Sequence, residues 1–192
     1  NEWSAQNGDG IDISGCKNVL ITNCFLNVGD DGICMKSSGK STEPALQNVV
    51  ITNCTVYHAH GGFVIGSNTD GGMHNIYVNN CNFMYTDVGL RFKSARDRGG
   101  LVDNIFIKDI YMKDIQNEAI LFDTYYENKE LGKNDATPSV TDKTPHFCKF
   151  YIENIYCNGA KQAIRIAGLP EMPIEDIVFN NITIKASKGY TE

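Results

Sequence analysis

Three aspartates, one histidine and two cations occupy short segments in the first half of the chain. Asp9 and the pair Asp30–Asp31 precede similar apolar runs, and His60 stands at the corresponding place before a third run. Arg91 and Lys93 lie within a fourth run. Carboxylates that are held close together can divide the roles of proton donor and proton acceptor, which general acid–base catalysis requires. These residues can do such chemistry only if the fold brings them together.

An internal repeat predicts how they are positioned. Six copies with alternating apolar residues begin at Asn18, Asn48, Asn75, Asn104, Lys149 and Asp176. The first four copies start 30, 27 and 29 residues apart, and a second alternating run follows each of the first five copies. β-Branched residues are frequent in these runs, and helical periodicity is almost absent. The pattern predicts an all-β fold, a right-handed parallel β-helix of about six or seven coils.

We expect one domain over residues 1–192, which is part of a longer helix, because the chain starts inside a running repeat. Residues 127–148 break the rhythm, so they are predicted to form a projecting loop of the kind that often lines a binding groove. Asparagine recurs at the turn that follows the first strand of a copy, where it tolerates a left-handed backbone and can form a side-chain ladder. These asparagines are Asn23, Asn53, Asn80, Asn154 and Asn181.

Composition narrows the possible partners. The formal net charge of −6 argues against nucleic acid, and no run of about 18 apolar residues predicts a membrane span. The seven cysteines show no CxxC or Cys/His metal spacing. We therefore expect no metal and no other cofactor, and we predict that Cys24, Cys54 and Cys81 form a stack of buried thiols.

Aligning the second strands of the copies gives a register. It places Asp9 beside Asp31 and Asp30 beside His60 on neighbouring coils, which are about 4.8 Å apart in a parallel sheet. Arg91 and Lys93 lie two coils beyond the aspartate pair.

The same alignment predicts which residues face the core. Eight apolar residues are predicted to point inward: Ile11, Ile13, Ile33, Met35, Phe63, Ile65, Leu90 and Phe92. Residues predicted to point outward are Asp12, Cys34, Val64 and Arg91, with Lys36, Gly66 and Lys93 beyond them. Glycines predicted to keep the floor of this face low are Gly8, Gly10, Gly29, Gly32, Gly61 and Gly62.

Four segments resemble the signature blocks of family 28 glycoside hydrolases, the polygalacturonases. The blocks Asn-x-Asp, Asp-Asp, Gly-His-Gly and Arg-Ile-Lys are similar to residues 7–10, 29–31, 60–62 and 91–93. Order and spacing agree, and the resemblance runs from Asn7 to Tyr126. The departures are Gly8 in place of Thr, Ala59 before the histidine, and Phe92 in place of Ile.

The resemblance implies a secreted, periplasmic or extracellular enzyme that hydrolyses α-1,4-galacturonosidic linkages of polygalacturonan or pectin with inversion. It implies that Asp30 is the general acid and that Asp9 and Asp31 position and activate water. His60 would hydrogen-bond Asp30 or bind the sugar. The expected partner is the polysaccharide alone, and we expect a monomer.

The resemblance also implies substrate contacts. Arg91 and Lys93 would bind the galacturonate carboxylate rather than support the fold. Tyr126 is the best match to a tyrosine that packs against the sugar, and Tyr125 is the alternative. The glycine-rich segments are most similar to those of exo-acting members, although endo action stays open. Other substrates are rhamnogalacturonan and xylogalacturonan, and other classes are a calcium-dependent pectate lyase and a non-catalytic β-helical carbohydrate-binding module.

Overall fold

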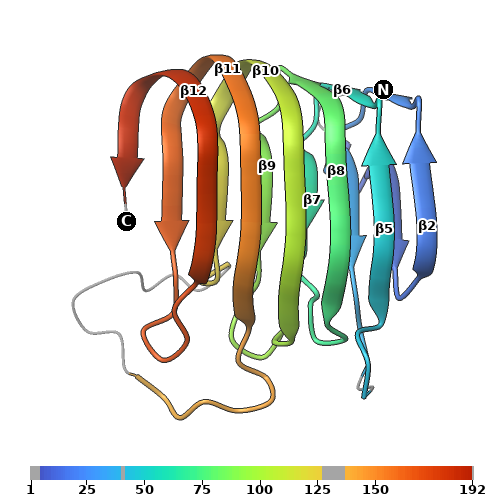
Figure 1. Cartoon of the computed structure of the whole chain (residues 1–192), viewed down its shortest axis with the longest axis vertical. Helices are drawn as coiled ribbons and strands as arrows, with labels where there is room; N and C mark the ends of the chain where they lie inside the picture. Colours follow the sequence, from blue (N-terminus) through green and yellow to red (C-terminus); the bar gives the residue numbers. More distant parts are fainter. Residues whose placement is uncertain (1–4, 40–41, 127–136, 192) are drawn as a thin grey trace.

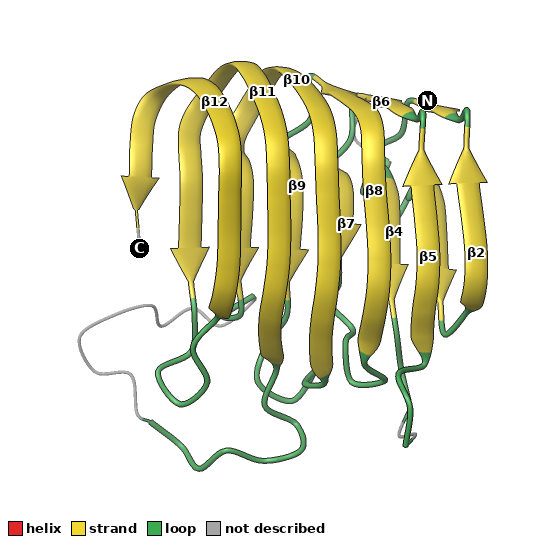
Figure 2. Ribbon diagram, viewed as in Figure 1, coloured by secondary structure: helices red, strands yellow, loops and turns green. Residues whose placement is uncertain are grey.

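The computed structural model describes residues 5–39, 42–126 and 137–191. Within these ranges every regular secondary-structure element is a β-strand (Figure 2). The strands are β1 (Ile11–Ser14), β2 (Lys17–Thr22), β3 (Phe25–Leu26), β4 (Ile33–Lys36), β5 (Leu46–Thr52), β6 (Thr55–Tyr57), β7 (Gly61–Ile65), β8 (Met73–Met84), β9 (Val88–Lys93), β10 (Leu101–Asp123), β11 (His146–Ala167) and β12 (Glu175–Thr191). No helix in this part of the chain could cross a membrane.

The strands stack in parallel into a solenoid (Figure 1). One face follows the order β2-β5-β8-β10-β11-β12, and a second face follows β1-β4-β7-β9 and continues into β10. The long strand β10 belongs to both faces, because its first part pairs with β8 and its last part pairs with β9. The predicted parallel β-helix is therefore confirmed, with about six coils.

The core is built from the inward columns of successive coils. Six of the eight residues predicted to point inward are fully buried, namely Ile33, Met35, Phe63, Ile65, Leu90 and Phe92. Ile11 and Ile13 are only partly buried, because β1 ends the described stack and pairs with β4 alone. Cys54 and Cys81 are buried and Cys24 is partly buried, and all three are free thiols, as the repeat predicts.

Left-handed residues bracket the first strand of each coil. The five predicted asparagines have φ values of 48° to 56°. Their side chains form part of the expected ladder, since Nδ2 of Asn80 donates to Asn53 at 2.6 Å and Nδ2 of Asn181 donates to Asn154 at 2.9 Å. A second left-handed column, five residues earlier, was not predicted. It contains Asn18, Asn48, Asn75, Asn104, Lys149 and Asp176, with φ values of 54° to 58°.

The predicted projecting loop lies only partly within the described residues, since 127–136 fall outside them. Its predicted end at residue 148 is wrong, because β11 already begins at His146 and pairs there with Leu101 of β10. Residues before β11 lie against the turn that follows β9. The carbonyl of Lys143 accepts hydrogen bonds from the backbone N–H groups of Asp97 at 3.1 Å and Gly99 at 3.0 Å.

Candidate active site

The turns that lead into β1, β4, β7 and β9 place the predicted residues in two columns. Backbone hydrogen bonds fix the register: Gly10 N–H donates to Asp31 at 2.9 Å, His60 N–H donates to Asp30 at 2.8 Å, and Val88 N–H donates to His60 at 3.1 Å. Asp9 and Asp31 thus share one column, and Asp30, His60 and Asp87 share the next. This is the arrangement that the repeat predicts.

The Asp30 side chain is partly exposed and lies between two backbone N–H groups and the His60 imidazole. Its Oδ2 accepts a hydrogen bond from Asn7 N–H at 3.1 Å, and its Oδ1 accepts one from Asp31 N–H at 2.8 Å. His60 Nδ1 lies 3.2 Å from Asp30 Oδ1, and the His60 side chain is 42% exposed. On its other side, His60 Nε2 lies 3.9 Å from Asp87 Oδ2. The imidazole therefore stands between two carboxylates and within reach of solvent.

Asp31 is buried and fully engaged by cations. Its side chain is 2% exposed, Arg91 Nη1 donates to its Oδ1 at 3.1 Å, and Lys93 Nζ donates to its Oδ2 at 2.8 Å. The long side chains of both cations span the two coils that separate them from Asp31. Such charge-assisted contacts are stronger than neutral hydrogen bonds. Asp31, Arg91 and Lys93 thus form one compensated network.

Asp9 is neutralised by a different cation. Lys36 Nζ donates to Asp9 Oδ2 at 3.0 Å and to Asp12 Oδ2 at 2.6 Å. Burial acts to lower the pKa of Lys36, but its hydrogen bonds to Asp12 and Asp9 outweigh that effect and raise the pKa. Lys36 therefore stays charged and holds the Asp9 carboxylate in place.

Asp9, Asp31 and Cys34 each bring one oxygen or sulfur atom within 4.8 Å of the others. The chemistry of this set suits an ion-pair network better than a calcium site. Calcium takes six to eight oxygen ligands, whereas here one donor is a thiol whose pKa is raised chiefly by burial. The two carboxylates already bind the ammonium groups of Lys36 and Lys93.

The two neighbouring tyrosines lie in different surroundings. The ring of Tyr126 lies beside three cations, with Lys93 Nζ 5.0 Å, Arg91 Cζ 5.8 Å and Arg98 Cζ 5.9 Å from its centroid. Tyr125 is buried and its ring faces Arg96 instead. The structure therefore brings Tyr126, and not Tyr125, to the cluster.

Two features of this face were not predicted. Cys34, Val64 and Lys93 are buried although they point outward, because the long side chains of the cluster cover the sheet and the Cys34 thiol contacts Gly66 O at 3.3 Å. Gly10, Gly32 and Gly62 do not simply lower the floor. A Cβ at any of them would meet neighbouring backbone or core side chains at 2.3 to 2.7 Å. They are glycines because successive coils approach closely there.

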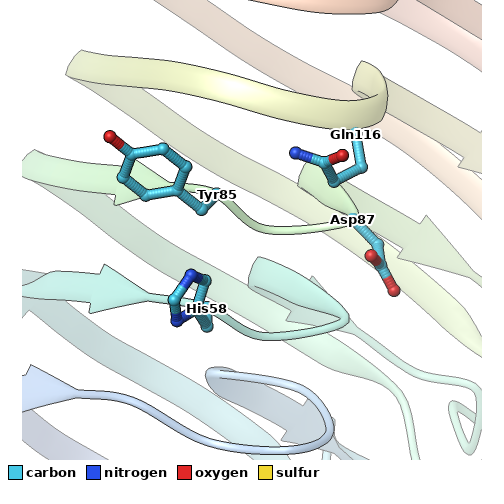
Figure 3. A pocket seen from close by; sticks show the side chains of 4 residues that line it. All are labelled: His58, Tyr85, Asp87 and Gln116. Carbon is cyan, nitrogen blue, oxygen red and sulfur yellow. The ribbon is translucent and has the colours of Figure 1, made fainter. Parts of the chain in front are cut away.

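Beside His60, a cavity of about 560 Å³ is lined by His58, Tyr85, Asp87 and Gln116 (Figure 3). Burial raises the pKa of Asp87, and the charges of His60 and Arg91 oppose this shift. Sequence reasoning placed Asp87 in the column of Asp30 without giving it a role, and it missed the other three residues. The sequence marks these three residues only weakly as lining a cavity, because each is a single residue at a turn and belongs to no motif.

Comparison with known proteins assigns the family. The model of glycosyl hydrolases family 28 matches residues 1–192. The chain belongs to glycosyl hydrolase family 28. The family that the sequence resemblance indicated is therefore confirmed.

Several family 28 proteins are similar to this chain. It is 30% identical to an exo-poly-α-D-galacturonosidase of Dickeya chrysanthemi, over 95% of this chain and 31% of that protein. It is 33% identical to an endo-polygalacturonase of Pectobacterium carotovorum, over 68% of this chain and 31% of that protein. The crystal structure of a hyperthermoactive exopolygalacturonase from Thermotoga maritima superposes with a TM-score of 0.81 at 28% identity, covering 97% of this chain and 41% of that one. The chain thus spans less than half the length of these relatives.

Proposed function

We propose that the protein is a glycosidase that hydrolyses α-1,4-galacturonosidic linkages of polygalacturonan or pectin with inversion at the anomeric carbon. The observation that carries this proposal is the single cluster in which three carboxylates, one imidazole and two cations lie in register on one face. Family membership supports the reaction class, and the Dickeya and Thermotoga relatives are named for action on galacturonan.

Asp30 is the proposed general acid. It would give its proton to the leaving glycosidic oxygen, and it is suited to this role because it is partly open to solvent and adjoins His60. A water molecule held by Asp9 and Asp31 would attack the anomeric carbon from the opposite side and lose its proton to a carboxylate. The lone pairs that their cations leave unused are available to such a water. Inversion follows because attack and departure occur on opposite faces.

Arg91, Lys93 and Tyr126 are the proposed substrate contacts. The Arg91 side chain is 19% exposed while its Nη1 binds Asp31, so the exposed part of its guanidinium can meet a ligand. A uronate carboxylate offers a planar, two-oxygen acceptor for that group. The Tyr126 ring beside these cations offers an apolar surface to a sugar.

Exo action is the mode that the names of the Dickeya and Thermotoga relatives suggest, whereas the Pectobacterium relative is named as an endo enzyme. Rhamnogalacturonan and xylogalacturonan are the competing substrates. A polysaccharide does not cross a membrane, so the proposed reaction takes place outside the cell or in the periplasm.

Digestion of polygalacturonate tests the proposal. We expect new reducing ends, and proton NMR in the first minutes should detect the inverted anomer. Chromatography of the products separates exo from endo action. A product that absorbs in the near ultraviolet, together with loss of activity in chelator, would identify a lyase. Binding of the polymer without release of reducing sugar would identify a carbohydrate-binding module.

A further inference from the structure

Three segments meet at the corner that carries Tyr126, the proposed sugar contact. They are the turn after β9 (residues 94–100), the corner itself (residues 124–126) and the loop between β11 and β12 (residues 168–174), all at the lower end of the solenoid in Figure 1. Tyr126 N–H donates to Ser94 O at 3.0 Å, and Thr124 N–H donates to Ala167 O at 3.0 Å. The backbone of the corner is therefore bound on both sides.

A two-pronged ion pair joins the turn after β9 to the loop after β11. Arg96 Nε donates to Glu171 Oε1 at 2.6 Å, and Arg96 Nη2 donates to Glu171 Oε2 at 2.9 Å. The Glu171 side chain is only 2% exposed, whereas that of Arg96 is 26% exposed. Two parallel hydrogen bonds fix the plane of a guanidinium as well as its position. The Glu171 carboxylate therefore holds Arg96 in one orientation.

The guanidinium that is held in this way lies against Tyr125 and not against Tyr126. Arg96 Cζ lies 5.6 Å from the centroid of the Tyr125 ring, and Tyr125 is buried. A cation near the face of an aromatic ring is attracted to it, most strongly where water is excluded. The charge of Arg96 is compensated by Glu171, so Arg96 is suited to ordering the tyrosine beside the sugar contact.

The loop that carries Glu171 also binds the residue before the two tyrosines. Thr124 and Leu169 are fully buried, and Leu169 N–H donates to Thr124 Oγ1 at 3.1 Å. Met172 N–H donates to Leu169 O at 3.1 Å, which closes the loop on either side of Glu171. Consecutive residues share their backbone, so a shift of Tyr125 also displaces the residue that follows it.

We propose that Glu171 is a positioning residue for the proposed reaction, because it sets the place of the Tyr126 ring through Arg96 and Tyr125. The inference rests on the proposed function, in which Tyr126 contacts the sugar, and it adds a residue from the next coil. Glu171 touches no reacting atom, so its loss should weaken substrate binding and leave the chemical step unchanged. Such a change raises KM at constant kcat.

A double-mutant cycle on polygalacturonate tests this role. It compares the parent with Glu171→Gln, Tyr126→Ala and the variant that carries both changes. Glu171→Gln keeps the size of the side chain but turns an amide N–H toward an Arg96 donor, so we expect KM to rise about tenfold while kcat stays within about twofold. In the Tyr126→Ala background the same change should raise KM less than about twofold, because the ring that Glu171 positions is gone.

Two further variants sharpen the cycle. Arg96→Lys keeps a positive charge beside Glu171 but loses the two-pronged contact, so it should repeat the pattern of Glu171→Gln in both backgrounds. The matched control is Glu153→Gln, which removes one partner of an exposed ion pair with Lys108. It should change neither KM nor kcat. Thermal unfolding checks that each variant is folded at the assay temperature.

An equal rise of KM in both backgrounds, an unchanged KM in the parent background, or a fall of kcat at constant KM would overturn the positioning role. Loss of the fold in both Glu171→Gln and Arg96→Lys would make the ion pair a structural element and would overturn it too. A parent that does not hydrolyse polygalacturonate contradicts the proposed function itself. An active parent whose KM is unaffected by Tyr126→Ala contradicts only the sugar contact of Tyr126, and the role of Glu171 falls with that contact.

Discussion

Asp30 and Asp31 are neighbours in the chain but occupy opposite environments. Asp31 is 2% exposed, and both of its oxygens bind cations. Asp30 is partly open, and its side-chain partners are two backbone N–H groups and an imidazole that is itself 42% exposed. Successive residues of an extended segment point to opposite sides, so one turn supplies a buried carboxylate and an accessible one.

This difference separates two tasks within one cluster. Asp31 organises Arg91 and Lys93, because each oxygen of its buried carboxylate binds one of these cations. Asp30 can exchange a proton with solvent or His60, as a general acid must after each turnover. Asp30 is thus suited to proton transfer, whereas Asp31 is suited to holding its neighbours, and the proposed water, in fixed positions. The predictions below test this contrast.

The largest effect is expected at Asp30. Asp30→Asn keeps the acceptor for one backbone N–H group but removes the transferable proton, so hydrolysis of polygalacturonate should fall by ~10²–10⁴-fold. Binding of the oligomer, measured by titration calorimetry, should stay nearly unchanged. Glu43→Gln is the matched control, because Glu43 forms an exposed ion pair with Lys17. A variant at position 30 that retains more than about half of the parent's turnover would contradict the assignment.

The two lysines that bind Asp31 and Asp9 test this contrast in their contribution to stability. Lys93 is 8% exposed and pairs with buried Asp31, whereas Lys36 is 30% exposed and pairs with Asp9 and Asp12. Lys93→Ala leaves a buried carboxylate with one cation fewer and should cost ~3 kcal/mol of unfolding free energy, or ~6–12 °C in melting temperature. Lys36→Ala should cost less than ~1 kcal/mol. Calorimetry measures both melting temperatures. Equal decreases for the two variants would mean that the buried lysine stabilises the fold no more than the exposed one.

The fold could be predicted because its signal is repeated. Apolar columns such as Ile33–Phe63–Leu90 recur at each coil, and so do the asparagines at the left-handed turns. A parallel register with one coil per repeat then placed Asp9 beside Asp31 and Asp30 beside His60. The end of the predicted loop was wrong because β11 begins at His146, two residues before the predicted loop end at 148, and its pairing with β10 extends that far.

The contacts within the site were harder to predict. Removal of Lys93 was expected to leave the fold intact, because alternation points it outward. The structure instead buries it on Asp31, since a lysine side chain is long enough to span two coils. The cavity at Tyr85 was missed for a related reason. It depends on how side chains from three turns meet, and a repeat predicts the position of Cα atoms but not the direction of long side chains.

Arg91 binds Asp31, but its side chain is also 19% exposed. Arg91→Lys keeps a charge for Asp31 but cannot make a two-pronged contact with a uronate. We expect kcat/KM on polygalacturonate to fall by ~10–30-fold, which corresponds to ~1.5–2 kcal/mol. Methyl-esterified pectin, whose carboxyl groups are neutral, should show a much smaller loss. An equal loss on both polymers would make Arg91 a structural residue.

The smallest effect concerns Asp87, the other carboxylate beside His60. Burial raises its pKa, and the nearby charges of His60 and Arg91 oppose the shift while that of Asp31 adds to it. A raised pKa means that the folded protein binds the proton more tightly than the unfolded chain, so ionisation of Asp87 opposes folding. This penalty is absent below the unfolded value of 3.8 and complete above the folded value.

Asp87→Asn should therefore raise the melting temperature slightly at pH 7, by a few degrees at most, and leave it unchanged at pH 3. Asp31→Asn should do the reverse at pH 7, because it removes a carboxylate that two cations stabilise. Thermal unfolding of both variants at the two pH values measures the difference directly. A lower melting temperature for Asp87→Asn at pH 7 would mean that its contact with His60 compensates its burial, and the two carboxylates would then differ only in degree.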